Sequence, residues 1–394
     1  MKQLLIIIFI LIAGGAKGYT KDFDYSHIAP HPRLLLKEGE ERNIHIALQK
    51  STVLQAFHKR ILDYCDETLK EAPVKRIKEG KRLLGVSRIV LKRVFYLSYA
   101  YRMTGEKEYL RRAEKEMLAA ASFIDWNPSH FLDVSEMSMG LAIGYDWLFN
   151  ELLPDSRKKI RQAIVEKAIE ASKTKHASFY QSRTNWNQVC NGGLVCSALA
   201  IYEDEPEKTK EIINKALQTV PLALECYAPD GGYPEGFGYW SYGTSYQVML
   251  NDALESSLGH DAGLSDYPGF LQSAQYIQYM TAPTGDCFNF SDASPKAYGN
   301  IMMFWFAHKT KNPSLLWLEK KYLNDANLEF GEYLEERFLP CLLIFASRID
   351  LDEVISPKGN TWHSIGTTPV YIYRSGWNYK TDTYLGVKGG TAST

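Results

Sequence analysis

The segment Tyr227–Tyr246 holds the residues best suited to chemistry in this chain. It reads YAPDGGYPEGFGYWSYGTSY, so large rings stand beside five glycines and the carboxylates of Asp230 and Glu235. Loops of this length are usually small and polar, whereas rings beside flexible glycines suit a cleft for a flat, hydroxylated sugar. Tyrosine is also a weak acid that can move a proton when its pKa is lowered. The segment predicts an enzyme that acts on a polysaccharide through tyrosine chemistry.

The spacing within this segment allows two interpretations. Intervals of four, three and four residues separate Glu235, Tyr239, Tyr242 and Tyr246. If the chain is helical from Tyr239 onward, these side chains line one face. A buried aromatic stripe has the same spacing, but the adjoining Asp-Gly-Gly at 230–232 favours a cleft.

A second cluster combines amide side chains with a tryptophan. The order is Asn185, Trp186, Asn187 and Gln188, shortly before Gly192-Gly193. We expect Asn185 to cap a helix, which places Asn187 and Gln188 in its first turn. Amide donors at a helix N-terminus can converge on an anion. The alternative is a capped structural helix with a buried tryptophan.

A third cluster places His130 just ahead of another expected helix. There it could act as a general acid or bind substrate, or it could be a structural cap. Asp133 and Glu136 have the spacing of an N-cap residue and its partner at the third helical position. The nine histidines are dispersed without metal-ligand spacing, and GxSxG, GxxxxGK[ST] and HExxH are absent from the sequence.

Composition limits the class of protein. The net charge is −1 and no basic block stands out, which argues against nucleic-acid binding. Six scattered cysteines without a CxxC pair predict buried free thiols rather than a metal site. Lys2, an apolar run and small residues up to Gly18 predict a signal peptide over 1–18 and a periplasmic or secreted product without a stable membrane anchor.

The elements that would position these residues are mainly helices. Apolar spacing over residues 19–348 predicts about ten to twelve helices in antiparallel hairpins, with Pro154 and Pro206 near helix starts. Such hairpins can curl into a toroid. Residues 349–394 differ, because 369–374 and 383–388 alternate like strands around a turn. Two strands do not form a stable sheet alone, so either they pack on the helical body or they open a β-domain that continues beyond Thr394. We favour the second.

Taken together, these residues resemble the heparinase II/III-like polysaccharide lyases and the related alginate lyases. The resemblance covers about residues 30–394 and rests on the following blocks: His31–Leu35, Tyr145–Trp147, Asn185–Gln188, Asn191–Gly193, Asp230–Gly243, Arg374–Trp377 and Lys388–Gly390. It implies an N-terminal (α/α) toroid, a C-terminal β-sandwich and a cleft between them.

The resemblance also implies an activity. These enzymes cleave polysaccharides that contain uronic acids by β-elimination. One group neutralises the C5 carboxylate, a base removes the C5 proton, and an acid protonates the leaving oxygen. Carried onto this sequence, Asn187 matches the neutralising amide and Tyr239 the acid or base. By the resemblance, Glu235 and Gln188 are candidates to position substrate. We also expect Tyr242, His130, Trp186 and Trp240 to bind it.

The sequence departs from this pattern in two places. Many relatives have an Asn-His pair where this chain has Asn185-Trp-Asn187. The histidines and the structural zinc that some relatives carry on the β-domain should follow Lys388–Gly390, where the sequence ends. We therefore expect a truncated lyase with no cofactor in this chain, and a zinc ion only in the missing part of the β-domain. The expected partner is an acidic polysaccharide, and no oligomeric state is indicated.

Two other functions fit the same residues. An (α/α)-toroid glycoside hydrolase would need two opposed carboxylates, which Asp133, Glu136, Asp230 and Glu235 could supply. A non-catalytic glycan-binding protein would use the same rings without turnover.

Overall fold

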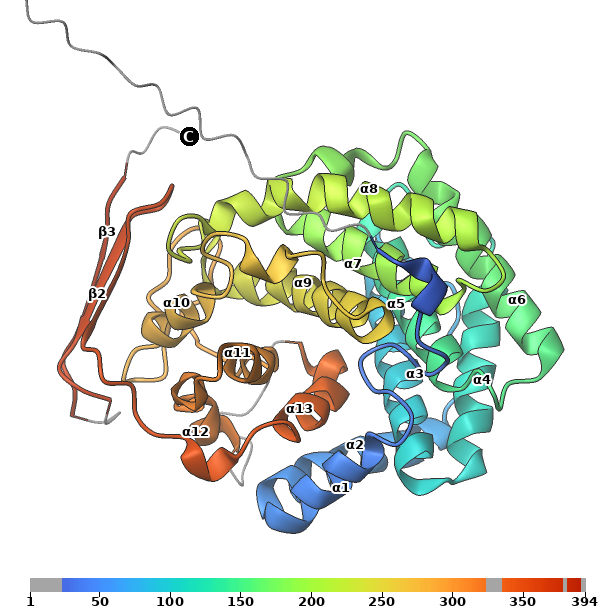
Figure 1. Ribbon diagram of the computed structural model, residues 1–394, viewed down its shortest axis with the longest axis horizontal. Helices are drawn as coiled ribbons and strands as arrows, with labels where there is room; N and C mark the ends of the chain where they lie inside the picture. The colour runs from blue at the N-terminus through green and yellow to red at the C-terminus, as the bar shows by residue number, and fades with distance from the viewer. Residues whose placement is uncertain (1–22, 324–334, 378–380, 391–394) are drawn as a thin grey trace, which may run out of the picture.

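Helices dominate the chain, and a small sheet follows them (Figure 1). The computed structural model describes residues 23–323, 335–377 and 381–390, and the expected signal peptide lies outside them. Within the described residues the helices are α1 (Glu41–Lys50), α2 (Thr52–Lys70), α3 (Leu84–Thr104), α4 (Lys107–Ala121), α5 (Phe131–Trp147), α6 (Pro154–Ile164), α7 (Asn185–Ala200), α8 (Pro206–Leu224), α9 (Gly236–Leu258), α10 (Ser273–Met280), α11 (Met303–Thr310), α12 (Glu319–Leu323) and α13 (Leu339–Ala346). The expectation of a mainly helical chain is confirmed. None of these described helices is long and apolar enough to cross a bilayer.

The long helices α3, α5, α7 and α9 pack side by side in the same direction. Along α3 and α5, Gly140 faces Leu91, and one turn later Gly144 faces Val94. A Cβ atom at Gly140 would lie 2.7 Å from the Cα of Leu91, so only glycine permits this approach. The pairs α5–α7 and α7–α9 are also parallel, because residues later in one helix contact residues later in the other. The N-terminal ends of all four helices therefore lie at one end of the body, which we call the N-terminal rim.

Other helices complete this arrangement. The return helices α4 and α8 pack against α3 and α7. Near the end of the helical region, α13 packs against α2 and α3, so this part of the chain returns to its beginning (Figure 1).

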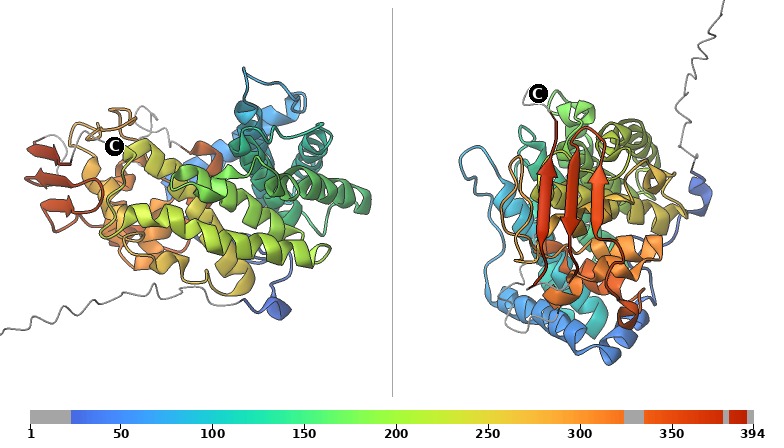
Figure 2. Two further views of the ribbon diagram at one scale, coloured as in Figure 1. Left: turned by 90° about the horizontal axis from the view of Figure 1, so that it is seen from above. Right: turned by 90° about the vertical axis from the view of Figure 1, so that its left-hand side faces the viewer.

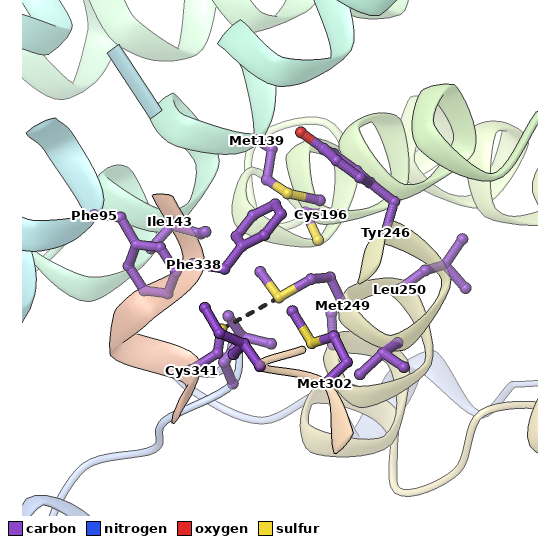
Figure 3. Packing of buried hydrophobic residues seen from close by; sticks show 14 of the residues in the cluster. Phe95, Met139, Ile143, Cys196, Tyr246, Met249, Leu250, Met302, Phe338 and Cys341 are labelled. Carbon is purple, nitrogen blue, oxygen red and sulfur yellow. Dashed lines mark hydrogen bonds between the residues drawn. The ribbon is translucent and has the colours of Figure 1, made fainter. Parts of the chain in front are cut away.

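The centre is filled with aromatic, aliphatic and sulfur-bearing side chains (Figure 3). Those that point toward one another come from four of the helices and from the segment before α13, and include Phe95, Ile143, Tyr246, Met249, Phe338 and Cys341. The Cys341 thiol donates a hydrogen bond to the Met249 sulfur at 3.4 Å. All six cysteines are free and only Cys226 is partly exposed, which confirms the prediction of free thiols.

The sheet packs on the helical body at one side (Figure 2). Its antiparallel strands are β1 (Thr361–Ser364), β2 (Val370–Arg374) and β3 (Tyr384–Lys388), in that order. Trp362 meets the ring of Tyr276 on α10 at 5.5 Å, and the Tyr384 hydroxyl donates to the Tyr279 carbonyl at 3.0 Å. The two predicted strands are confirmed, whereas β1 was not predicted. The outer face exposes Tyr371, Tyr373, Leu385 and Val387.

Two of the helix starts differ from the prediction. The expected starts at Pro154 and Pro206 are confirmed. Helix α5, however, begins at Phe131, so Asp133 is not its N-cap; its carboxylate accepts the backbone N–H of Leu83 at 2.6 Å. Helix α7 is capped by Thr184 rather than by Asn185, because the Thr184 hydroxyl accepts the N–H of Trp186.

Two of the sequence blocks form a buried clasp. One carboxylate oxygen of Asp146 accepts the backbone N–H groups of Arg33 and Leu34, at 2.9 and 2.8 Å. The other oxygen lies 2.5 Å from Nδ1 of His31, whose Nε2 lies 3.2 Å from Glu203. Trp147 donates from Nε1 to the Leu34 carbonyl at 2.7 Å. These blocks therefore attach the N-terminal segment to α5 and have a structural role.

The clasp predicts a pH-dependent stability. Burial lowers the pKa of His31, but its hydrogen bonds to Asp146 and Glu203 outweigh burial, so the pKa is raised. The charge-dependent stabilisation is complete below the unfolded pKa of about 6.5 and is lost as pH rises through the folded pKa. His31→Asn should lower the free energy of unfolding by about 1.5–3 kcal/mol at about pH 5.5, measured by urea denaturation. The difference from wild type should narrow at alkaline pH.

The matched control is His27→Asn, because His27 has 83% of its side chain exposed and its described side-chain hydrogen bonds go to the neighbouring Asp24 and Ser26. The free energy of unfolding of His27→Asn should match that of wild type at every pH. A constant difference between His31→Asn and wild type at every pH would refute the charged clasp.

Candidate functional site

Part of the predicted site lies at the N-terminal rim, and part of it is interior. His130 directly precedes α5, and its ring meets Trp186 of α7 edge to face at 5.0 Å. Asn185, the first residue of α7, donates from Nδ2 to Oε2 of Glu235 at 3.3 Å, just before α9. The structure therefore brings three predicted site residues, His130, Trp186 and Glu235, to the starts of three helices. Asn185, which was predicted only as a cap, lies among them.

Tyr239 lies on the same side of α9. It precedes Gly243 by one helical turn, so the two share a face. A Cβ atom at Gly243 would lie 3.0 Å from the Cβ of Asn185, which shows how closely this face approaches α7. Tyr239 and Trp186 are both partly exposed, so a ligand at the rim can reach them.

The glycine-rich segment before α9 does not form the expected open cleft. The Asp230 carboxylate accepts the Ser364 hydroxyl and the Ile365 N–H, both at 2.7 Å, and so ties this segment to β1. A Cβ atom at Gly232 would lie 2.7 Å from the Cβ of Ser364. Gly236 has a φ of +83°, and an added Cβ atom would lie 2.7 Å from the Phe290 carbonyl oxygen. These glycines allow close packing against neighbouring segments.

The sequence position of Asn187 suggested a side chain that faces an anion at a helix N-terminus, but Asn187 lies in the interior. Its side chain is fully buried, and both amide hydrogens are used: Nδ2 donates to the carbonyls of Ser182 and Thr219 at 3.0 and 2.9 Å. Its oxygen accepts Nδ2 of Asn191 at 2.8 Å. Asn187 therefore joins α7 to α8 and to the segment before α7.

Two further predicted contacts are also interior. Gln188 is fully buried and donates to the Tyr227 hydroxyl at 3.0 Å. Trp240 is fully buried and stacks on Phe306 at 5.8 Å. Both belong to the packing behind the rim, and the prediction that they touch substrate has no support from their positions.

The rim also contains an ionic cluster that the sequence analysis missed. The Tyr242 hydroxyl donates to Oε1 of Glu136 at 2.9 Å. The same carboxylate receives Nε of Arg88 at 2.9 Å and Nη2 of Arg337 at 3.1 Å, while Nε of Arg337 lies 2.7 Å from its other oxygen. Glu335 pairs with Arg337. The residue that could have indicated this cluster is Glu136, because a carboxylate in a fully buried helix needs charged or hydrogen-bonding partners.

This cluster defines what Tyr242 can do. Burial, followed by the negative charge of Glu136, raises the pKa of Tyr242 well above its usual value, although Arg88 and Arg337 oppose the shift. A phenol in this setting stays protonated and donates its hydrogen bond. Tyr242 is therefore suited to holding Glu136 through this hydrogen bond.

The described residues contain no group of three or more His, Cys, Asp or Glu side chains arranged to hold a metal ion.

The contacts of Asn187 predict a stability effect. Asn187→Ala should lower the free energy of unfolding by about 1–3 kcal/mol, because it leaves the Thr219 carbonyl buried without that donor. Asn185→Ala is the matched control on the same helix, since it removes one 3.3 Å contact to a partly exposed partner. Urea denaturation should separate the two variants. Equal stability would contradict a structural role for Asn187.

Comparison with known proteins adds no relative. No protein-family model matches the sequence, and no curated protein matches it. The functional assignment therefore rests on the residues and their geometry.

Proposed function

We propose that this protein is a polysaccharide lyase that cleaves glycans containing uronic acids by β-elimination. The observation that carries the proposal is the arrangement at the N-terminal rim. There the amide Asn185 and the partly exposed phenol of Tyr239 lie on facing surfaces of α7 and α9, beside His130 and Trp186. These are the group types that β-elimination next to a carboxylate requires.

The proposed scaffold is an (α/α) toroid. Four parallel helices with return helices behind them, and the contact of α13 with α2 and α3, support this assignment. The resemblance to heparinase II/III-like lyases of the sequence blocks at 185–193 and 230–243 supports it as well.

The parallel helices also favour an acidic substrate. Each helix N-terminus carries a partial positive charge of about half an elementary charge, and backbone N–H groups there can face an anion. Four such ends point to the same rim. A uronate carboxylate placed there is stabilised, and so is the negative charge that develops when its C5 proton leaves.

The proposed roles follow from burial and hydrogen bonding. Asn185 replaces Asn187 as the neutralising amide. Asn185 is also buried, with 4% exposed, but its amide donates to the partly exposed Glu235 at the rim, whereas both amide hydrogens of Asn187 are bound in the interior. Tyr239 transfers the proton. The C5–H bond breaks, its electron pair forms the C4=C5 double bond, and the C4–O bond breaks with protonation of the leaving oxygen. Glu235 orients Asn185 through their hydrogen bond.

The carboxylates are less suited to a hydrolase. Asp133 and Glu136 are fully buried and hydrogen-bonded, and Asp230 is tied to β1. Glu235 is partly exposed at the rim, where it accepts hydrogen bonds from Asn185 and Tyr233. A hydrolase needs two carboxyl groups on opposite sides of the scissile bond, so these positions favour elimination.

Tyr239→Phe should reduce elimination by about 10²–10⁴-fold, because it removes the proton-transfer group while keeping the ring. The protein is expressed from its complete coding sequence and incubated with heparin-, chondroitin- and alginate-type glycans. The ultraviolet absorbance of the unsaturated uronide measures turnover.

Tyr101→Phe is the matched control. Tyr101 is also partly exposed, but it lies at the C-terminal end of α3, away from the rim, and its variant should keep the wild-type rate. Saturated products from wild type would indicate a hydrolase. Binding without any turnover would indicate a glycan-binding protein, and full activity of Tyr239→Phe would transfer the role to another group.

A further inference from the structure

We propose that Arg88 is a substrate-binding residue whose terminal guanidinium nitrogens contact a uronate carboxylate, and that Glu136 holds it in place for this purpose. The inference rests on the proposed function and assigns a specificity role to a residue outside the predicted site.

The first argument is orientation. Nε of Arg88 donates to Glu136 at 2.9 Å, and the guanidinium carbon lies 5.2 Å from the centre of the Tyr242 ring. Glu136 is itself fixed by Tyr242 and Arg337. When Nε of a guanidinium is bound, the edge formed by its two terminal nitrogens is still available to a second partner. This geometry suits a bidentate contact with a carboxylate.

The second argument is access. Arg88 has 42% of its side chain exposed, whereas Arg337 has 8% and Glu136 none. Among the described residues, the hydrogen bonds and ion pairs of Arg88 involve Nε and the Glu136 carboxylate, and its terminal nitrogens have no described protein partner. By contrast, Arg112 uses both terminal nitrogens on backbone carbonyls and Glu116.

The third argument is position. Arg88 lies in the second turn of α3 and contacts residues in the second turns of α5 and α9. Helical side chains lean toward the N-terminus, which carries this guanidinium toward the rim. Tyr239 precedes Tyr242 by three residues on α9, so Arg88 and the proposed proton-transfer group belong to the same end of the body.

The charges allow such a role. Arg88 and Arg337 face the carboxylates of Glu136 and Glu335. The two cations are balanced by the two carboxylates, and the most exposed charge of the cluster is the Arg88 guanidinium. An incoming carboxylate therefore meets this cation first.

The test measures binding separately from turnover. Isothermal titration calorimetry uses an alginate-derived tetrasaccharide, its carboxyl-reduced counterpart and a heparin-derived tetrasaccharide. Arg88→Ala should weaken binding of the alginate tetrasaccharide about 10-fold or more, which corresponds to about 1.4 kcal/mol. The carboxyl-reduced sugar should bind both proteins equally. Arg88→Lys keeps the charge but loses the paired terminal nitrogens, so its affinity for the alginate tetrasaccharide should lie between those of wild type and Arg88→Ala. In turnover measurements, Arg88→Ala should raise KM more than it lowers kcat.

Arg157→Ala is the matched control, because it removes the same charge from a partly exposed arginine that packs on Phe149 of the body. It should bind like wild type. Thermal unfolding checks that Arg88→Ala is folded, and Arg88→Lys keeps the test valid if it is not.

Several results would overturn the assignment. Unchanged affinity of both Arg88 variants would do so, as would an equal loss for the carboxyl-reduced sugar. A loss confined to the heparin tetrasaccharide would assign Arg88 to sulfate instead. If wild type bound none of the three glycans, the proposal would fall. The two proposals can fail separately: elimination with unaffected Arg88 variants refutes this one alone, and Arg88-dependent binding without elimination refutes the lyase alone.

Discussion

The close approach of four parallel helices is the constraint on which this structure depends. It requires glycine where backbones meet: a Cβ atom at Gly140 would lie 2.7 Å from the Cα of Leu91, and one at Gly192 would lie 2.9 Å from the Tyr246 carbonyl oxygen. Because the four helices are parallel, their N-terminal ends lie at the same end of the body. Residues more than 150 positions apart, such as Arg88 and Tyr242, thereby become neighbours. The candidate site is a product of this packing.

The sequence predicted those features that local chemistry decides. Proline fixes the starts of α6 and α8, since it lacks the N–H that a first turn does not use. Alternating residues predicted β2 and β3. β1 was not predicted because it has only four residues, although Gly359 and Asn360 directly precede it. At α7 two capping residues stand side by side, and the choice of Thr184 over Asn185 depends on backbone geometry that the sequence does not display.

The sequence placed most candidate site residues near the starts of helices, and only tertiary contacts show which of them reach the rim. Asn185 and Asn187 occupy the same helical turn, yet one faces α9 and the other faces the Thr219 carbonyl of α8. Sequence spacing cannot separate them. The glycines at 230–236 suggested an open cleft, because a sequence does not show what a missing side chain makes room for. Here the room is taken by β1 and by the Phe290 carbonyl. The roles proposed for Tyr239 and Asn185 remain predictions for experiment.

The sulfur atoms of the core have a practical consequence. Burial raises the pKa of the Cys190 and Cys341 thiols well above the usual value and that of Cys196 to about 12. Alkylating reagents attack the thiolate, so these groups react slowly while the chain is folded. A brief treatment with iodoacetamide, followed by mass spectrometry, would therefore measure the fraction of molecules whose core cysteines have become accessible. The protein contains its own labels for measuring how often its interior is exposed, without any engineered probe.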